Sequence, residues 1–351
     1  MAVFGTGSYP TLYNVTQAMD PKGDPAQIVE LLQQTNAPIL DIPWGEGNLP
    51  TGEQTNVRTG IPKPIWRKWY QGVPSTKSEY ARIIDTCGEL ANRSEVDKKA
   101  ADFNGNSKAF RFGEALGVLE GMNQEFCRAL FYGDNTLAPE QFNGLSPRFS
   151  SLEAPNGIKN IIDAGGTGSD NSSIWLICWG QTTVFGIYPK GSKGGLTRQD
   201  LGEIDCFDTN GDKYRGYADI FGWDCGLVVK DWRYIVRIAN IDMSVLEAQS
   251  TGAADLIKLM VQALHRVPNL GIVQTGRENP SANGAAPIPL APNPVFYTNR
   301  TIAEMLDVES LAKTFYTLKS GNDAFGRPVT YVRGIPVRTC DQLIDTEGRV
   351  F

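Results

Sequence analysis

Residues 47–73 read GNLPTGEQTNVRTGIPKPIWRKWYQGV, and they are the most informative part of the sequence. It combines short alternating segments, which favour β-strands, with prolines, which lack an amide hydrogen for a sheet ladder. Pro62 and Pro64 therefore cannot lie in a central strand. We predict a long, exposed β-hairpin or loop over residues 45–80.

The charge of this region has one sign. Between Gln54 and Ser78 there are five basic residues and no acidic one, so the segment carries +5. The whole chain carries −6 at pH 7, which leaves −11 on the remainder. A chain this acidic is not a nucleic-acid binder as a whole, and its basic segment favours contact with an acidic surface. The five cations are Arg58, Lys63, Arg67, Lys68 and Lys77.

Aromatic residues are interleaved with these cations in Trp66-Arg67-Lys68-Trp69-Tyr70. Such a run can stack the bases of single-stranded nucleic acid. It can equally anchor a protein interface, where Trp, Tyr and Arg are enriched. The negative remainder of the chain favours the protein interface.

The clearest helix follows at residues 108–132, where apolar side chains recur at helical spacing. Gly133 supplies a C-terminal stop. At ~1.5 Å per residue this helix is almost ~40 Å long, which is unusual for a globular enzyme. Its predicted apolar positions are Phe112, Leu116, Leu119, Met122, Phe126 and Leu130.

The rest of the chain mixes helices and strands, so the predicted fold class is α+β. A short helix should begin at Asp24 and end before Pro38. After residue 251 the helical spacing returns, and Thr301 caps another helix. The predicted strands are Ile174–Gly180, Val184–Tyr188, Gly202–Phe207, Tyr214–Phe221, Val228–Ile241, Val295–Tyr297 and a final pair within Pro328–Arg338 around Gly334.

The composition is that of a folded protein. The 351 residues are 41% hydrophobic and 21% charged, which excludes a disordered or coiled-coil chain. No stretch approaches the ~18 apolar residues of a membrane-spanning helix, and no signal pattern begins the chain. The six cysteines form no C-x-x-C pair, and a single histidine leaves no Cys–His zinc site. We expect a soluble protein made in the cytoplasm, with reduced thiols and neither metal nor cofactor.

Three motifs imitate functional sites. Gly165–Gly168 resembles a phosphate-binding loop, but a strand follows where that loop needs a helix, so a turn is predicted. Asp208–Asp212 resembles a calcium loop, but Lys213 occupies the position of the required glycine, and Asn-Gly within it favours a hairpin turn. His265 is best explained as a cation at a helix C-terminus, without a nucleophile motif beside it.

Seven segments spread over the chain resemble major capsid proteins of short-tailed bacteriophages, which have the Hong Kong 97 fold. The order of arm, basic loop, long helix, β-rich region and helical lobe is similar to that fold. The segments are GNLPTGEQTNVRTGIPKPIWRKWYQGV (47–73), CGELANRSEVDKKAADFNG (87–105), EGMNQEFCRALFYG (120–133), DAGGTGSDNSSIWLICWG (163–180), DWRYIVRIANID (231–242), VFYTNRTIAEML (295–306) and GIPVRTCDQL (334–343).

The resemblance implies a domain layout with a permuted order. In the common order the long strands close the chain, whereas here they precede the helices after residue 251. The implied domains are an N-arm (1–44), an extended E-loop (45–80), a P-domain (81–245, with the spine helix 105–133 and long strands 174–241) and an A-domain with the C-terminal segment (246–351).

The resemblance also implies partners. Copies of the chain would form the hexamers and pentamers of an icosahedral shell around double-stranded DNA, without sequence-specific binding and without a membrane. The short region before the E-loop implies a separate scaffold protein, and the family implies a portal protein at one vertex and decoration proteins on some shells. The expected location is the virion, after assembly in the host cytoplasm.

The E-loop and N-arm are expected to link neighbouring subunits, and the cations of the loop to meet acids near the neighbour's spine helix. The expected loop residues are Arg58, Lys63, Trp66, Arg67, Lys68, Trp69, Tyr70 and Lys77. The expected acidic partners are Glu95, Asp97, Glu114, Glu120 and Glu125.

The alternative class is a β-rich hydrolase that cleaves a polysaccharide with paired carboxylates. Nearly any acidic protein contains candidate pairs, so the sequence leaves this alternative open.

Overall fold

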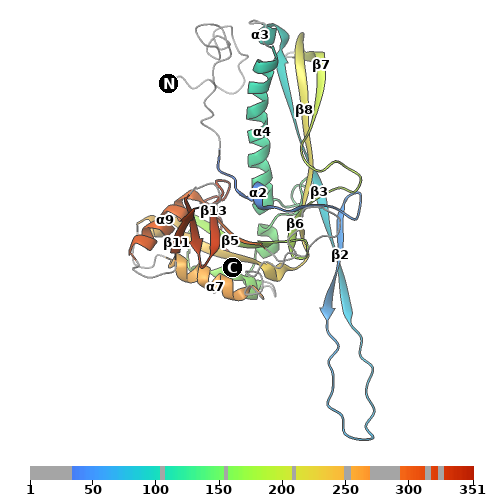
Figure 1. The fold of residues 1–351 in the computed structure, drawn as a ribbon, viewed down its shortest axis with the longest axis vertical. Helices are drawn as coiled ribbons and strands as arrows, with labels where there is room; N and C mark the ends of the chain where they lie inside the picture. Colours follow the sequence, from blue (N-terminus) through green and yellow to red (C-terminus); the bar gives the residue numbers. More distant parts are fainter. Residues whose placement is uncertain are drawn as a thin grey trace. The chain divides into compact units, whose positions relative to one another are not determined.

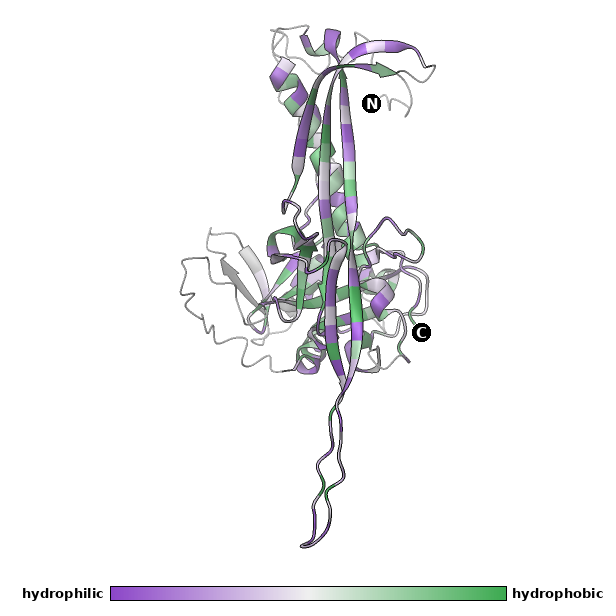
Figure 2. Cartoon of the chain, turned by 90° about the vertical axis from the view of Figure 1, so that its right-hand side faces the viewer, coloured by the Kyte–Doolittle hydropathy of each residue, from purple (hydrophilic) through white to green (hydrophobic). Residues whose placement is uncertain are grey.

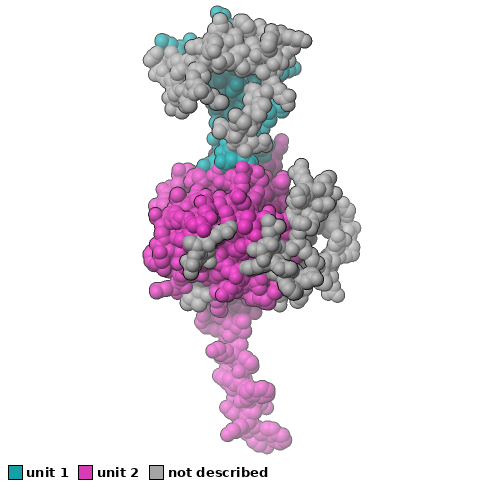
Figure 3. Space-filling model, turned by 90° about the vertical axis from the view of Figure 1, so that its left-hand side faces the viewer, with its two compact units in different colours: residues 1–34, 90–125, 196–223 teal, residues 35–89, 126–195, 224–351 magenta. Residues whose placement is uncertain are grey.

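A computed structural model describes residues 34–102, 107–153, 157–207, 211–248, 254–268, 293–312, 318–322 and 328–351. The helix predicted at Asp24 lies outside these residues. The chain divides into two compact units (Figures 1 and 3). Unit 1 comprises residues 1–34, 90–125 and 196–223, and unit 2 comprises residues 35–89, 126–195 and 224–351.

Strand β5 (Asn171–Trp179) is the centre of a mixed sheet in unit 2 (Figure 1). It pairs in antiparallel register with β9 (Ile235–Asp242) and with β10 (Asn293–Thr298). All of its residues are buried, so elements must cover both of its faces. The strand predicted at Ile174–Gly180 is confirmed as a central one.

The other elements of unit 2 extend this sheet or pack around it. The order β11-β12-β13-β10-β5-β6 continues the sheet, and β12 and β13 form the pair predicted around Gly334. The elements are α2 (Pro38–Asp41), β1 (Trp44–Glu46), β2 (Gly52–Gly60), η1 (Ser146–Phe149), α5 (Gly157–Asn160), β4 (Ile161–Asp163), β6 (Val184–Tyr188), η2 (Trp232–Tyr234), α6 (Met243–Glu247), α7 (Leu256–Arg266), α9 (Arg300–Ala312), β11 (Leu318–Asn322), β12 (Pro328–Val332) and β13 (Ile335–Thr339).

The two faces of β5 meet different partners. Ile174 and Leu176 share a buried apolar cluster with residues of α7 and α9. The alternate residues Trp175 and Trp179 contact aromatic rings on the other face, at centroid separations of 6.1–6.4 Å. Those rings belong to Phe131, Phe149 and Tyr297.

This shared sheet changes the predicted division of the chain at residues 245/246. β5 and β9 precede that position and β10 follows it, yet the three strands are hydrogen-bonded neighbours. Residues 81–245 and residues 246–351 therefore do not form two separate hydrophobic cores. By contrast, β7 (Thr197–Phe207) and the first part of β8 (Lys213–Val229) belong to unit 1.

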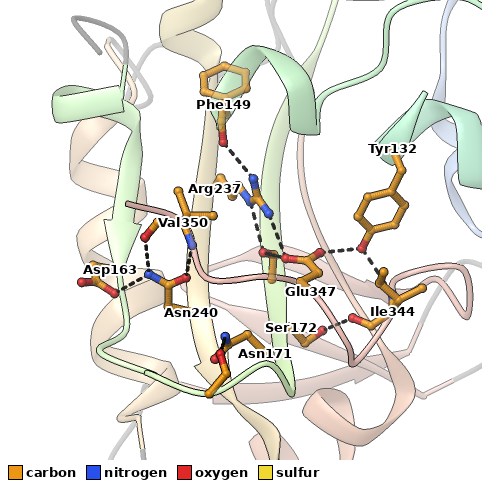
Figure 4. A network of polar contacts seen from close by, with 12 residues as sticks. Tyr132, Phe149, Asp163, Asn171, Ser172, Arg237, Asn240, Ile344, Glu347 and Val350 are labelled. Atoms are coloured by element: carbon orange, nitrogen blue, oxygen red, sulfur yellow. Dashed lines mark hydrogen bonds and ion pairs between the residues drawn. The ribbon is translucent and has the colours of Figure 1, made fainter. Parts of the chain in front are cut away.

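A buried ion pair fixes the C-terminal segment to the sheet (Figure 4). Arg237 on β9 and Glu347 are 3% and 5% exposed, and Arg237 Nη2 donates to Glu347 Oε2 at 2.8 Å. Glu347 also accepts hydrogen bonds from Tyr132 Oη at 2.5 Å and from Ser173 Oγ. Burial and the Glu347 carboxylate raise the pKa of Tyr132 well above its ordinary value, so Tyr132 stays a donor. Arg237 Nη1 donates to the Phe149 carbonyl at 2.8 Å, so both buried charges have partners.

Unit 1 contains residues 107–125 of helix α4 (Ser107–Tyr132), which confirms the long predicted helix. It also contains α3 (Lys98–Asp102), β7 and parts of β8 and β3 (Glu79–Asp97). β7 and β8 pair from Thr197↔Gly222 to Phe207↔Lys213 as a hairpin, and Gly211, with a φ of +88°, lies in its connection. Asn210 of the predicted Asn-Gly turn lies outside the described residues.

The buried face of α4 differs from the prediction. Met122, Phe126 and Leu130 are buried as expected, but Phe112 and Leu116 are 61% and 42% exposed. At 100° per residue, Phe112 and Leu116 lie about 80° and 120° around the helix from Met122, so these two positions leave the face that Met122 occupies. The described core of unit 1 instead contains Ala115, Leu119, Met122 and Phe221.

Two predicted element boundaries also need correction. The strand expected over Val228–Ile241 is interrupted, because η2 separates β8 from β9. The α9 helix begins one residue before Thr301, and Asn299 Oδ1 accepts from the Ile302 amide at 2.7 Å. Asn299, not Thr301, is therefore the capping residue.

Strands β2 and β3 form the hairpin predicted within residues 45–80. Their ladder runs from Gly52↔Thr86 to Arg58↔Tyr80, with an irregularity before Gly60. Gly52 has a φ of +155°, and a Cβ there would lie 2.0 Å from the Asp85 carbonyl oxygen. Only glycine fits this close approach between the two strands.

Glu347→Ala should lower the free energy of unfolding of the subunit by about 3–5 kcal/mol, because it leaves the Arg237 guanidinium buried without its carboxylate. A urea titration followed by tryptophan fluorescence measures this loss. Arg215→Ala is the control, since Arg215 pairs with Asp205 at an exposed site and its loss should cost at most ~1 kcal/mol. Equal losses in the two variants would contradict the role given to the buried pair.

Gly52→Ala should destabilise the hairpin by about 1–3 kcal/mol, because alanine strains the backbone at this φ and displaces the Asp85 carbonyl. Amide hydrogen exchange along β2 should then accelerate. Gly72→Ala is the matched control, because no atom lies within 4 Å of a Cβ at that position. Unchanged exchange in Gly52→Ala would show that the ladder does not depend on this glycine.

Candidate assembly interface

Two ion pairs hold the base of the β2–β3 hairpin. Glu53 and Asp85 face each other across the strands, and both are buried. Asp85 Oδ1 accepts from Arg148 Nη2 at 2.7 Å, and its Oδ2 accepts from the Val229 amide at 3.3 Å. Lys230 Nζ lies 3.3 Å from Glu53 Oε1. Because each buried carboxylate has its own cation, the base of the hairpin is fixed within unit 2.

Beyond this base the register gives the hairpin two different faces. Side chains alternate along a strand, and directly opposed residues share a face. The pairs Thr55↔Ile83 and Val57↔Ala81 make one face largely apolar. The pairs Asn56↔Arg82 and Arg58↔Tyr80 make the other face cationic.

Arg58 and Tyr80 form a stacked pair on the cationic face. The Arg58 guanidinium lies 5.4 Å from the centre of the Tyr80 ring, and its Nη2 donates to Tyr80 Oη at 3.2 Å. The hydrogen bonds from Arg58 and Ser78 lower the pKa of Tyr80. Arg58 therefore has an aromatic partner but keeps its charge available to a second surface.

Residues 61–78 join the two strands and extend from them (Figure 2). Trp66, Trp69 and Tyr70 are 101%, 90% and 103% exposed, so these rings are not packed in the described chain. The Gln71 amide donates to the Lys68 carbonyl at 3.2 Å, which makes a turn at the tip. Aromatic surface of this extent is typical of a protein interface.

The cations of the loop have no acidic partner within the residues that the structure describes. The ion pairs found there join other residues, and none includes a loop cation. All five cationic side chains are exposed: Arg58, Lys63, Arg67, Lys68 and Lys77.

Most of the predicted acidic partners are engaged within unit 1. Glu95 Oε1 lies 2.7 Å from Arg93 Nη2, and Asp97 Oδ1 accepts from the Lys99 amide at 2.7 Å. Partial burial disfavours the charged form of Glu120, but hydrogen bonds outweigh that effect and lower its pKa. Their donors are Gln124 Nε2 at 2.9 Å, the Gln34 amide at 3.0 Å and Asn123 Nδ2 at 3.3 Å.

The remaining two acids lie on α4. Glu114 is exposed and forms no ion pair in the described part of the chain, and Glu125 is half-buried. The pairing of these acids with loop cations stays a prediction.

Sequence reasoning missed Arg82, Tyr80 and the buried pairs at the hairpin base. Arg82 lies outside the basic run, because Glu79 separates it from Lys77. Only the strand register places Arg82 beside Arg58. Glu53 and Asp85 find their cations in Lys230 and Arg148, far along the chain. No local pattern signals such long-range pairs.

The chemistry of the described residues favours no catalytic or metal site. No group of three His, Cys, Asp or Glu residues there is arranged to hold a metal ion. Burial raises the pKa of Cys87 to about 11 and of Cys225 to about 12, so both thiols are poor nucleophiles at neutral pH.

Gly165 has a φ of +92° in the connection before β5, as predicted for a turn, and His265 lies in the last turn of α7. No described helix has the length and apolar character needed to cross a membrane.

Comparison with known proteins gives a family. A family model described as major capsid protein GP7 matches residues 20–351. A chain in the near-atomic structure of bacteriophage Epsilon15 is 31% identical, with a TM-score of 0.72 over 100% of this chain and 99% of that chain. The bacteriophage JBD30 capsid is 10% identical, with a TM-score of 0.48 over 89% and 93% of the two chains. No curated protein sequence matches the chain.

The family match covers almost the whole chain, and it leaves no support for the hydrolase alternative. The long helix, the projecting hairpin and the mixed sheet agree with the Hong Kong 97 fold expected from the sequence. The chain belongs to the major capsid protein GP7 family and is a structural, non-enzymatic protein of a bacteriophage capsid.

Proposed function

We propose that the β2–β3 hairpin and its loop link neighbouring subunits of the shell. The observation that carries this proposal is the exposure of Trp66, Trp69 and Tyr70 at the tip of a hairpin whose base is firmly held. Exposing three large rings to water does not stabilise a monomer, whereas contact with a second copy of the chain can bury them.

The aromatic residues should supply most of the stabilisation. A buried aromatic side chain removes about 150–250 Å² from water, which at ~25 cal/mol per Å² is worth up to roughly 4–6 kcal/mol. An exposed ion pair contributes only ~0.2–1 kcal/mol. The cations therefore act mainly on orientation, partner choice and salt dependence.

The acidic surface that receives the loop includes Glu114 in this proposal. Glu114 is exposed without an ion pair among the described residues, whereas Glu95 and Asp97 already have partners in their own chain. Glu120 and Glu125 would contribute at longer range. On the β2–β3 hairpin, Arg82 of β3 joins the five cations expected from the sequence.

The remaining assignments follow the family resemblance. We propose an N-arm at 1–44, an E-loop at 45–80, a P-domain that includes α4, β7 and β8, and an A-domain built on the β5 sheet. Strands β7 and β8, the P-domain strands of this proposal, precede α7 and α9, which supports a permuted order relative to the common fold. Hexamers and pentamers would assemble in the host cytoplasm with a separate scaffold protein and a portal protein at one vertex, with decoration proteins on some shells. The acidic chain would enclose double-stranded DNA without binding a sequence.

Reversing Arg58, Arg67 and Lys68 to glutamate together should leave a folded subunit that assembles poorly, because the loop then repels an acidic neighbour. Single neutral replacements should be tolerated, and added salt should weaken wild-type assembly. Sedimentation velocity measures the fraction of subunits in particles. The control reverses Lys190, Lys193 and Arg349, three exposed cations outside the hairpin, and makes the same change in net charge. If the two triple variants assemble alike, the loop is not an electrostatic contact.

Trp66→Ala with Trp69→Ala should raise the subunit concentration needed for assembly by more than tenfold, because the assembled state loses several kcal/mol of apolar burial per subunit. Light scattering over a concentration series measures this threshold, which should shift by a similar factor at low and high salt. Leu137→Ala is the control, since Leu137 is 85% exposed outside the hairpin. An unchanged threshold would refute the burial of these rings between subunits.

A further inference from the structure

Strand β2 lies at the edge of its sheet, so only one side of its backbone pairs with another strand, β3. The outer side is covered at first by the preceding residues of the same chain. Leu49 and Gly52 exchange backbone hydrogen bonds of 2.9 and 3.3 Å. The Asn48 side chain then takes both backbone groups of Gln54, because its Nδ2 donates to the carbonyl and its Oδ1 accepts from the amide, each at 2.8 Å. No described residue continues this cover beyond Gln54.

The covered positions fix the direction of the backbone groups that follow. In an antiparallel ladder, the amide and carbonyl of one residue point to the same side, and this side alternates along the strand. Gly52 and Gln54 point away from β3, so the backbone groups of Asn56 and Arg58 point away from it as well. No described residue bonds to these two amides and two carbonyls. The four groups form the free edge of β2.

The side chains around the free edge select the sequence that can pair with it. An unpaired strand edge accepts another extended chain as an added strand, and directly opposed residues share a face. Residues opposite Asn56 and Arg58 would share the face of two exposed guanidinium groups, those of Arg58 and Arg82, which favour acidic side chains. The alternate residues would share the face of Val57 and of Ile83, which is 37% exposed and favours apolar side chains. The free edge therefore fits an extended peptide in which acidic and apolar residues alternate.

We propose that the free edge of β2 binds, as an added strand, an extended segment of a different polypeptide in which acidic and apolar residues alternate. A second copy of β2 does not match, because edge-to-edge pairing would gather the cations of both copies, Arg58 included, on one face. Strand β7 has acidic residues at alternate positions, Glu203 and Asp205. These carboxylates already pair with Lys98 and Arg215 of their own chain. The inference concerns the strand below the loop, so it does not depend on the proposed role of the loop.

Titration of the full-length subunit with the peptide acetyl-VEVEVEV-amide tests the proposal by isothermal titration calorimetry. Hydrogen exchange resolved to single amides should slow at Asn56 and Arg58 on binding, whereas the amides of Thr55 and Val57 already face β3 and should change little. Two control peptides should bind on the order of tenfold more weakly or not at all. The lysine peptide acetyl-VKVKVKV-amide is repelled by the cationic face. The glutamate peptide N-methylated at its glutamates keeps the side chains but cannot donate to β2.

Asn56→Pro should weaken binding of the glutamate peptide about tenfold, because it removes the outward amide hydrogen without removing a bond to β3. Asn56→Ala is the matched control and should bind like wild type. Arg58→Glu should reverse the preference, so that the lysine peptide binds better than the glutamate peptide.

Absence of binding by the glutamate peptide, or equal binding by its N-methylated form, overturns the proposal. Slow exchange at Asn56 and Arg58 that appears without peptide as the subunit concentration rises shows that a second copy occupies the edge, and it also overturns the proposal. Exchange at Thr55 and Val57 reports whether a variant keeps the hairpin. The N-methylated peptide keeps the test valid on the wild-type chain if Asn56→Pro does not fold.

Discussion

Strand β5 imposes the main constraint on unit 2, because every one of its nine residues is buried and both of its faces must be covered. Helices α7 and α9 cover one face through an aliphatic cluster, and a layer of aromatic rings covers the other. The same strand carries Ser173, whose hydroxyl contacts both Arg237 and Glu347. Because Glu347 lies in the C-terminal segment, that segment must be in place before the buried guanidinium is neutralised. Glu347 and Val350 of the C-terminal segment are thus part of the core.

Local patterns in the sequence were sufficient for the hairpin, the long helix and β5. Each is a single run whose period or punctuation is visible within about twenty residues, such as the apolar run that becomes β5. The buried side of α4 could not be read in the same way. The row Phe112, Leu116 fits helical spacing as well as Ala115, Leu119, Met122 does, and only the position of Phe221 on β8 decides between them.

The candidate interface shows the same limit. Composition reveals the cations and rings of residues 58–77, because they are contiguous. Arg82 and the apolar face at Val57 and Ile83 become visible only when the strand register is known. The predicted acids show another limit of counting charges. A count of charges marks Glu95 as available, whereas the fold gives that carboxylate to Arg93.

The position of β3 in the sheet has a mechanical consequence. β3 has β2 on one side, which shares the loop, and β8 on the other. A neighbour that pulls on the loop pulls β3 along its own length. The force then acts on the hydrogen bonds between β3 and β8 as shear. These bonds carry the load together and do not break one after another. The ion pairs of Arg148 and Lys230 also hold the base of the hairpin, where the pulling force passes from the strands to the rest of unit 2. The hairpin is therefore attached to unit 2 in a geometry that resists a pull on its loop.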